Sequence, residues 1–118
     1  MTLPRDAMLL RVFIGEDDKY EGRPLYEVFV LKAREARLAG ATVLRGPMGF
    51  GHSSRLHTTK ILRLSSDLPI VIEIVDTEEQ IKRLLPHLEE MVQEGMITME
   101  HVMIILYRDG EPDGPQPE

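Results

Sequence analysis

The sequence predicts an α+β domain of the ferredoxin-like kind, in which a four-stranded antiparallel sheet carries two helices on one face. Three observations lead to this fold: four segments have strand patterns, two have helical periodicity, and their order is β-α-β, a long connection, then β-α-β. This order is the split βαβ arrangement. A chain of 118 residues suits one domain. We expect a lead over 1–7, the domain over 8–108 and a disordered, proline- and glycine-rich tail over 109–118.

The first β-α-β unit is expected to occupy the chain up to Leu44. Met8 to Ile14 is apolar on both faces, which indicates a central strand. A polar loop follows over Gly15 to Arg23, and Pro24 is a favourable first residue for a helix that Gly40 would cap. The apolar stripe of this helix consists of Leu25, Val28, Phe29, Ala36 and Ala39. Ala41 to Leu44 begins the second strand.

The second β-α-β unit begins with a strand over Pro69 to Val75. Residues 77–80 form a capping box for a helix that we expect to bend at Pro86 and to close at Gly95. Its apolar stripe consists of Ile81, Leu84, Leu85, Leu88, Met91 and Val92. Met99 to Tyr107 is the last strand. Because the strands are apolar on both sides and the helices cover one face, the other face needs a partner, most simply other copies of this chain.

The long connection from Arg45 to Asp67 separates the two units. Connections usually run about 4–6 residues, so one this long is generally a binding loop, a lid or a disordered segment. Its Gly49-Phe50-Gly51 turn allows the backbone to approach a ligand, and free N–H groups there can hold an anion with Arg45, Arg55 or Lys60 supplying charge. A β-bulge or tight bend that ends the second strand explains the glycines equally well.

Composition narrows the classes of function. The absence of cysteine excludes disulfides and thiolate metal sites. A net charge of -6 argues against general nucleic-acid binding, which requires a basic face. No apolar run approaches the roughly 18 residues that cross a membrane, so we expect a soluble, cytoplasmic protein.

Catalytic and metal chemistry have little support in the sequence. His52 and His57 lie in the long connection, but no carboxylate other than Asp67 is near at ligand spacing. Ser53 and Ser54 adjoin His52 without the strand-turn-helix setting of an activated nucleophile. The acidic residues 16–18 are interpreted as a solvated loop. We therefore expect neither a metal site nor an enzyme.

Several separated motifs resemble the PII-like family known as domain of unknown function 190. They are Ile14-Gly15-Glu16, Gly22-Arg23-Pro24-Leu25-Tyr26, Ala39-Gly40-Ala41-Thr42-Val43, Arg45-Gly46, Gly49-Phe50-Gly51, Leu56-His57-Thr58 and Leu68-Pro69-Ile70-Val71. The resemblance runs from about Met8 to Tyr107. More distantly, the chain is similar to nitrogen-regulatory PII signalling proteins, which are homotrimers that bind adenine nucleotides between subunits and present a long loop to a protein partner.

The resemblance implies a function and a set of ligand-binding residues. Gly49 and Gly51 match the glycines that line the PII nucleotide cleft, and His52 to Asp67 matches the regulatory loop. After the second helix only Gly95 is kept from the glycine-rich PII phosphate turn, with His101 near the lysine position, which favours AMP, ADP or another small anion over ATP. The implied ligand-binding residues are Arg45, Gly49, Phe50, Gly51, His52, His57, Thr58, Lys60 and His101.

Two hypotheses follow for the function. The first is a homotrimeric PII-like sensor that binds an adenine nucleotide and signals through its long loop to a protein partner, with a membrane transporter as one candidate. Arg45 to Gly51 would then be an ordered cleft wall and His52 to Asp67 the mobile reporter. The second is a structural or protein-interaction trimer that binds no small ligand.

Overall fold

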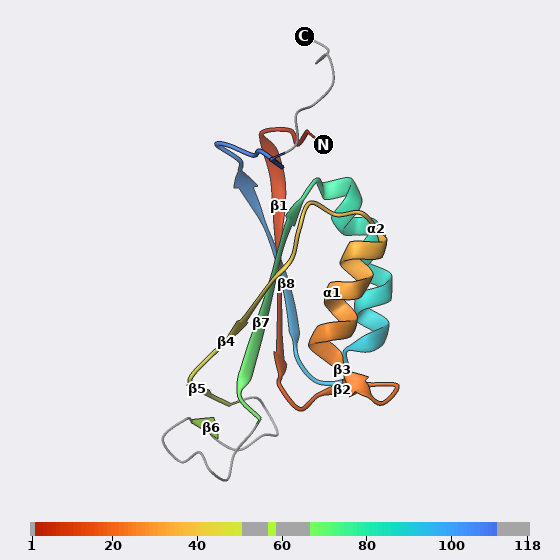
Figure 1. Cartoon of the computed structure of the whole chain (residues 1–118), viewed down its shortest axis with the longest axis vertical. Helices are drawn as coiled ribbons and strands as arrows, with labels where there is room; N and C mark the ends of the chain where they lie inside the picture. Colours follow the sequence, from red (N-terminus) through yellow and green to blue (C-terminus); the bar gives the residue numbers. More distant parts are fainter. Residues whose placement is uncertain (1, 51–56, 59–66, 111–118) are drawn as a thin grey trace.

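A computed structural model describes residues 2–50, 57–58 and 67–110. Its main sheet has the strand order β4-β7-β1-β8, and all three pairings are antiparallel. The strands are β1 (Asp6–Gly15), β4 (Thr42–Arg45), β7 (Pro69–Asp76) and β8 (Met96–Met103). The helices α1 (Leu25–Glu35) and α2 (Glu78–Met91) lie side by side on one face of this sheet (Figure 1). The predicted ferredoxin-like fold is confirmed.

The core lies between the sheet and the helices. Strand β1 is central, and its alternate residues Leu10 and Val12 are fully buried. Their partners on the sheet face, such as Ile72 opposite Val12, are buried as well. From the helices, Phe29 and Leu88 complete the same apolar cluster. The period-two pattern of β1 and β7 and the stripe of α2 therefore meet in one core, as the sequence predicts. The stripe predicted for α1 is right for Leu25, Val28 and Phe29 but wrong for Ala36, which is exposed, while Ala33 is buried instead.

Helix α1 ends at Glu35, five residues before the Gly40 cap that the sequence predicts. The prediction was wrong because the chain closes the helix with a Schellman motif: the N–H of Leu38 donates to the carbonyl of Ala33 at 3.1 Å, and that of Arg37 to Arg34 at 3.0 Å. Arg37 takes the left-handed conformation with φ of 60°. Leu38 is then buried in the core, which favours the early end.

Helix α2 begins as predicted and ends early. The backbone N–H of Gln80 donates to the Thr77 hydroxyl at 3.1 Å, which caps the N-terminus. Pro86 lies inside the helix, as expected. The helix ends at Met91 rather than at Gly95, and Gly95 instead turns the chain into β8 with φ of 150°.

Strand β8 lies three to four residues earlier than predicted. Met96 pairs with Phe13 directly after Gly95, and the last pair is Met103 with Asp6, the first residue of β1. The next backbone hydrogen bond joins the Ile104 N–H to the Arg5 carbonyl at 2.7 Å. The predicted strand over Met99 to Tyr107 was therefore misplaced, because the length of β1 limits where β8 can pair. Of the predicted tail, residues 111–118 lie outside the described part of the chain.

Two short hairpins complete the described structure. The β2 (Lys19–Tyr20) and β3 (Arg23–Pro24) strands are joined by Glu21 and Gly22, both with positive φ as a two-residue hairpin turn requires. The β5 (Met48–Gly49) and β6 (His57–Thr58) strands pair beyond the end of β4. They lie at the opposite end of the sheet from the N-terminus (Figure 1).

Candidate functional site

The long connection has two stems, residues 45–50 at its start and residues 67–68 at its end. Both are fixed to the end of the sheet. After β4, the N–H of Gly46 donates to the Pro69 carbonyl at 2.8 Å, so the chain stays beside the start of β7. The β5–β6 pairing then sets Met48 opposite Thr58 and Gly49 opposite His57. Both stems of the connection therefore converge on Pro69.

Two glycines allow this convergence. A Cβ atom at Gly46 or at Gly49 would lie 2.9 Å from Cγ of Pro69, closer than side chains tolerate. The glycines let the backbone pack directly on the proline ring. This contact explains the glycine at position 49 without a ligand and gives the tight-bend interpretation a structural basis. Gly49 also lines a cavity, as the binding interpretation requires.

A cavity of about 430 Å³ lies at this end of the sheet. Its apolar walls come from strands and from the β5 turn: Phe13, Ile14, Phe50, Pro69, Ile70, Val71 and Met96. Gly15, Gly49 and Gly95 add bare backbone. Because Phe13, Val71 and Met96 point away from the helices in the sheet register, the cavity extends to the uncovered face.

The charged lining of the cavity is acidic among the described residues: Asp18, Asp67 and Glu94. Desolvation raises the pKa of Asp18 above its ordinary value of 3.8, the hydrogen bond from the Gly15 N–H at 2.9 Å lowers it, and the neighbouring carboxylates raise it further. Carboxylates accept hydrogen bonds from hydroxyl and amino groups and repel phosphate. The described walls thus suit the uncharged part of a ligand.

The acidic loop after β1 holds both stems of the long connection. Glu16 forms an ion pair with Arg45 at the end of β4. The backbone N–H of Asp17 donates to Asp67 at 2.9 Å, and that of Glu16 donates to the Leu68 carbonyl at 2.8 Å. Residues 16–18, interpreted from the sequence as a solvated loop, therefore anchor the connection and border the cavity.

The implied ligand-binding residues fall into three groups. Gly49 and Phe50 line the cavity, and the backbones of His57 and Thr58 pair beside it. Arg45 pairs with Glu16 outside the lining, and His101 lies opposite Met8, about 17 Å along β8 from Met96 by strand geometry. Gly51, His52 and Lys60 lie outside the described residues.

Sequence reasoning missed Phe13, Asp18, Glu94 and Met96 as cavity residues. They come from two segments about 80 residues apart, which meet because β1 pairs with β8. The one available signal was the acidic run over 16–18, whose charge gave no indication that Asp18 faces a cavity.

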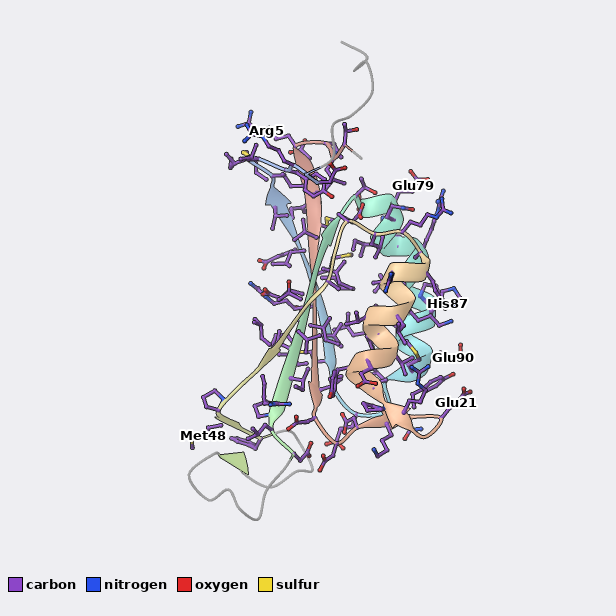
Figure 2. The ribbon with its side chains drawn as sticks, in the orientation of Figure 1. Arg5, Glu21, Met48, Glu79, His87 and Glu90 are labelled. Carbon is purple, nitrogen blue, oxygen red and sulfur yellow. The ribbon has the colours of Figure 1, made fainter. Side chains whose placement is uncertain are left out.

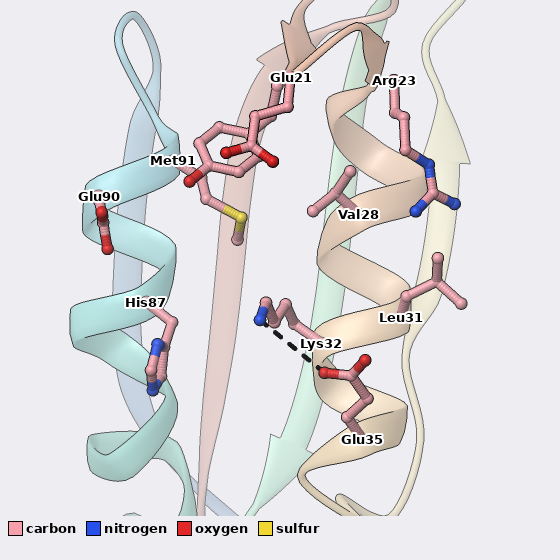
Figure 3. Close-up of a pocket in the computed structure, with 10 residues that line it drawn as sticks. Glu21, Arg23, Val28, Leu31, Lys32, Glu35, His87, Glu90 and Met91 are labelled. Carbon is pink, nitrogen blue, oxygen red and sulfur yellow. Dashed lines mark ion pairs between the residues drawn. The ribbon is translucent and has the colours of Figure 1, made fainter.

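A second cavity of about 410 Å³ lies between the outer sides of α1 and α2 (Figure 3). Lys32 forms an ion pair with Glu35 at 3.8 Å within it, and His87 and Glu90 border it from α2. Its polar lining mixes both signs of charge, so it selects for no class of ion.

Over residues 2–50, 57–58 and 67–110, no three histidine or acidic side chains gather to hold a metal. None of the helices described is long and apolar enough to span a bilayer.

Comparison with known proteins identifies the family. Residues 7–104 match DUF190, described as an uncharacterized ACR, and this match covers most of the chain. The chain belongs to the DUF190 family. A UPF0166 protein of Aquifex aeolicus is 42% identical over 97 residues, covering 82% of this chain and 91% of that protein. A UPF0166 protein of Methanocaldococcus jannaschii is 37% identical, covering 79% and 86%. The family resemblance seen in the sequence is confirmed.

Two solved structures share the fold of this DUF190 chain. CPII, a nitrogen regulatory PII-like protein from Thiomonas intermedia K12 bound to ADP, AMP and bicarbonate, aligns with a TM-score of 0.60 at 17% identity, covering 84% of this chain and 88% of CPII. A DUF3240 family protein from Shewanella baltica aligns with a TM-score of 0.52 at 15% identity, covering 94% and 100%. The architecture is therefore PII-like.

Proposed function

We propose that this DUF190 chain is a PII-like regulatory protein, a homotrimer that binds an adenine nucleotide or similar small anion in clefts between subunits. The observation that carries the proposal is the cavity of about 430 Å³ beside Gly49 and Phe50, at the end of the sheet where the long connection begins. Its apolar walls and few polar groups are typical of a small-molecule site.

The structural neighbour supports the choice of ligand. CPII was solved with ADP, AMP and bicarbonate, and it shares the fold of this chain at low sequence identity. The acidic lining of the cavity adds a preference, because Asp18, Asp67 and Glu94 disfavour a highly charged phosphate chain. The proposed order of affinity is therefore AMP above ATP, with adenosine against the described walls. Lys60 and the neighbouring subunit are the proposed sources of positive charge for the phosphate.

The uncovered sheet face supports the homotrimer. Its apolar side chains are only partly shielded, and they include Leu9, Phe13, Leu44, Val71, Val75 and Met96. In the same face, Arg11 donates to Glu73 at 2.9 Å and to Glu100 at 2.7 Å. Arg11 therefore pairs with both carboxylates within one subunit, and the cluster keeps one net negative charge that a subunit covering this face has to accommodate.

The long connection is the proposed signalling element, directed to a protein partner, for which a membrane transporter is one candidate. Its two stems meet residues 16–18, and Asp18 borders the cavity. A ligand in the cavity touches this anchor and can therefore favour one arrangement of the stems over another, provided that its affinity differs between them. On this proposal the protein acts by binding and not by catalysis.

Isothermal titration of the purified protein with AMP, ADP, ATP and bicarbonate tests the ligand, and light scattering tests the trimer. Phe50→Ala is expected to weaken nucleotide binding several-fold, because Phe50 lines the cavity and is 75% exposed, so its loss spares the core. Met48→Ala is the matched control from the same hairpin, exposed but outside the lining. Absence of heat and of a melting shift at millimolar nucleotide would refute nucleotide binding.

The acidic lining also favours a second candidate function, a protein-interaction trimer without a small ligand. In that case the connection recognises a partner directly, and the Arg45–Glu16 ion pair only shapes its first stem. Arg45→Ala would then change partner capture and leave the melting temperature insensitive to every nucleotide. A nucleotide-dependent change in partner capture by the wild-type protein decides for the first function.

A further inference from the structure

The cavity between α1 and α2 lies apart from the proposed nucleotide site, on the side of the helices that faces away from the sheet. Figure 2 shows Glu21, His87 and Glu90 on that side, and all three border the cavity. Its volume of about 410 Å³ falls in the range of small-molecule sites. Subunits packed on the uncovered face of the sheet would leave this cavity accessible, because the helices lie on the opposite face (Figure 1).

The floor of the cavity is apolar. Val28 of α1 and Met91 of α2 are buried, and both line it. Leu31 lines it as well and is 38% exposed, the one large hydrophobic side chain of the two described helices that is exposed. A ligand with an apolar body would remove this surface from water.

The rim of the cavity carries charges of both signs. Carboxylates come from Glu21, Glu35 and Glu90, and cations come from Arg23 and Lys32. Among the residues that the structure describes, Glu21, Arg23 and Glu90 form no ion pair. Lys32 contacts Glu35 at 3.8 Å, and because this contact is long and both side chains are exposed, it holds Lys32 weakly.

Charges at the start of α2 are arranged differently. Lys82 contacts Glu78 at 3.1 Å and Arg83 contacts Glu79 at 2.7 Å, each pair one helical turn apart. The charges around the cavity come from the β2–β3 turn, from α1 and from the end of α2, so they stand on different sides of a hollow. They are left for a partner that enters the hollow.

Glu21 has a backbone conformation that glutamate rarely takes. Its φ is 51°, in the left-handed region, and Gly22 follows with φ of 80° in the two-residue turn between β2 and β3. Asparagine followed by glycine is the favoured pair for such a turn, so a glutamate here costs stability. In Figure 3 its carboxylate lies beside Met91, over the space between the helices. A residue that strains its turn and faces a cavity indicates a binding role.

We propose that this cavity binds a small zwitterion whose ammonium group and carboxylate stand at opposite ends of an apolar body, as in an ω-amino acid or an apolar dipeptide. Figure 3 shows Glu21 towards one end of the space, Lys32 towards the other, and Val28 and Met91 between them. Glu21 would accept hydrogen bonds from the ammonium group, and Lys32 would donate to the carboxylate.

The mixed rim disfavours ligands that carry a single charge. An anion meets the carboxylates of Glu21 and Glu90, and a cation meets Arg23 and Lys32. A zwitterion places each of its charges against the opposite one, so both ends of the site contribute to its binding. The site is therefore selective for the separation of two charges.

Isothermal titration with ε-aminocaproate and with leucyl-leucine tests the site and distinguishes the two sources of the ligand. Heat of binding from either supports the site, and the tighter of the two identifies the class. Caproate and hexylamine keep the apolar body and one charge each, and they should bind at least about tenfold more weakly because each lacks one charge-assisted contact. A single-charge molecule that binds as tightly as the zwitterions overturns the proposal, and so does the absence of heat from both zwitterions at millimolar concentration.

Two variants of Glu21 separate binding from folding. Glu21→Asn suits the turn, so it should raise the melting temperature of the ligand-free protein while lowering the affinity for the zwitterion at least about tenfold. Glu21→Gln removes the charge without improving the turn, and it should lose affinity as well. Glu79→Gln is the matched control, because Glu79 is an exposed carboxylate at the far end of α2 and outside the lining (Figure 2).

The control should keep the wild-type affinity for the zwitterion. Glu21 variants that bind it as the wild type does overturn the proposal. Titration of the same variants with AMP should match the wild type, since Glu21 lies outside the lining of the nucleotide cavity. Failure of the zwitterion site therefore leaves the proposed nucleotide function intact.

Discussion

Replacement of Gly95 by alanine is predicted to destabilise this protein strongly, although the residue lies at the surface. A Cβ at this position would lie 2.5 Å from the Phe13 carbonyl oxygen, 3.1 Å from Cγ2 of Ile14 and 3.3 Å from Cγ1 of Val92. The carbonyl belongs to β1, which is held by strands on both sides, so it cannot retreat. The φ of 150° is also unfavourable for any residue with a side chain.

The two effects set the expected size of the loss. A strained backbone conformation costs of order 1–3 kcal/mol, and overpacking adds roughly 1–3 kcal/mol. The free energy of unfolding should therefore fall by about 2–6 kcal/mol, a large part of the roughly 5–15 kcal/mol that holds an ordinary domain together. Each kcal/mol lowers the melting temperature of a domain near this size by about 4 °C.

Urea unfolding followed by circular dichroism measures the loss, with every variant at one protein concentration, so that the proposed self-association contributes equally to all of them. Gly40→Ala is the matched control, since nothing lies within 4 Å of its Cβ position, and it should be neutral or stabilising by up to about 1 kcal/mol. A loss below about 1 kcal/mol for Gly95→Ala, or one equal to that of Gly40→Ala, would refute the reasoning.

Three further predictions concern polar and backbone features. Asp76→Ala should lower the free energy of unfolding by about 2–4 kcal/mol, because this buried carboxylate accepts the backbone N–H groups of Ala39 and Thr77, each at 2.7 Å. Asp76→Asn should lose less in the same urea assay. Arg37→Gly should raise the free energy of unfolding by roughly 1 kcal/mol, because glycine suits the left-handed conformation of this position. The control Arg34→Gly, inside α1, should lower it by about 1 kcal/mol. Melting curves that rank the two variants in the opposite order would contradict the Schellman motif. Asp18→Asn should raise the melting temperature at pH 7, because folding raises the pKa of Asp18 and its charge therefore destabilises the folded state above that pKa. The difference between the variant and the wild type should vanish below about pH 3.8, where Asp18 is protonated in both the folded and the unfolded state. A difference that persists there would point to the hydrogen bond from the Gly15 N–H instead.

The sequence by itself determined the elements, their order and the core. Strand β1 and helix α2 could be predicted because alternation and helical stripes record which face of each element is buried. The Thr77 to Gln80 cap was also predictable, since it depends on residues three apart. The family followed from separated motifs, and the match over residues 7–104 confirms it.

Only the tertiary structure decided the boundaries and the cavity. Helix α1 ends early because Leu38 reaches the core, and β8 starts early because Gly95 packs on a carbonyl more than 80 residues away. Asp18 and Met96 meet in one cavity for the same reason. Local patterns record the environment of each residue but not the distant partner that supplies it, so the positions where strands pair and helices stop depend on packing between segments far apart in the chain.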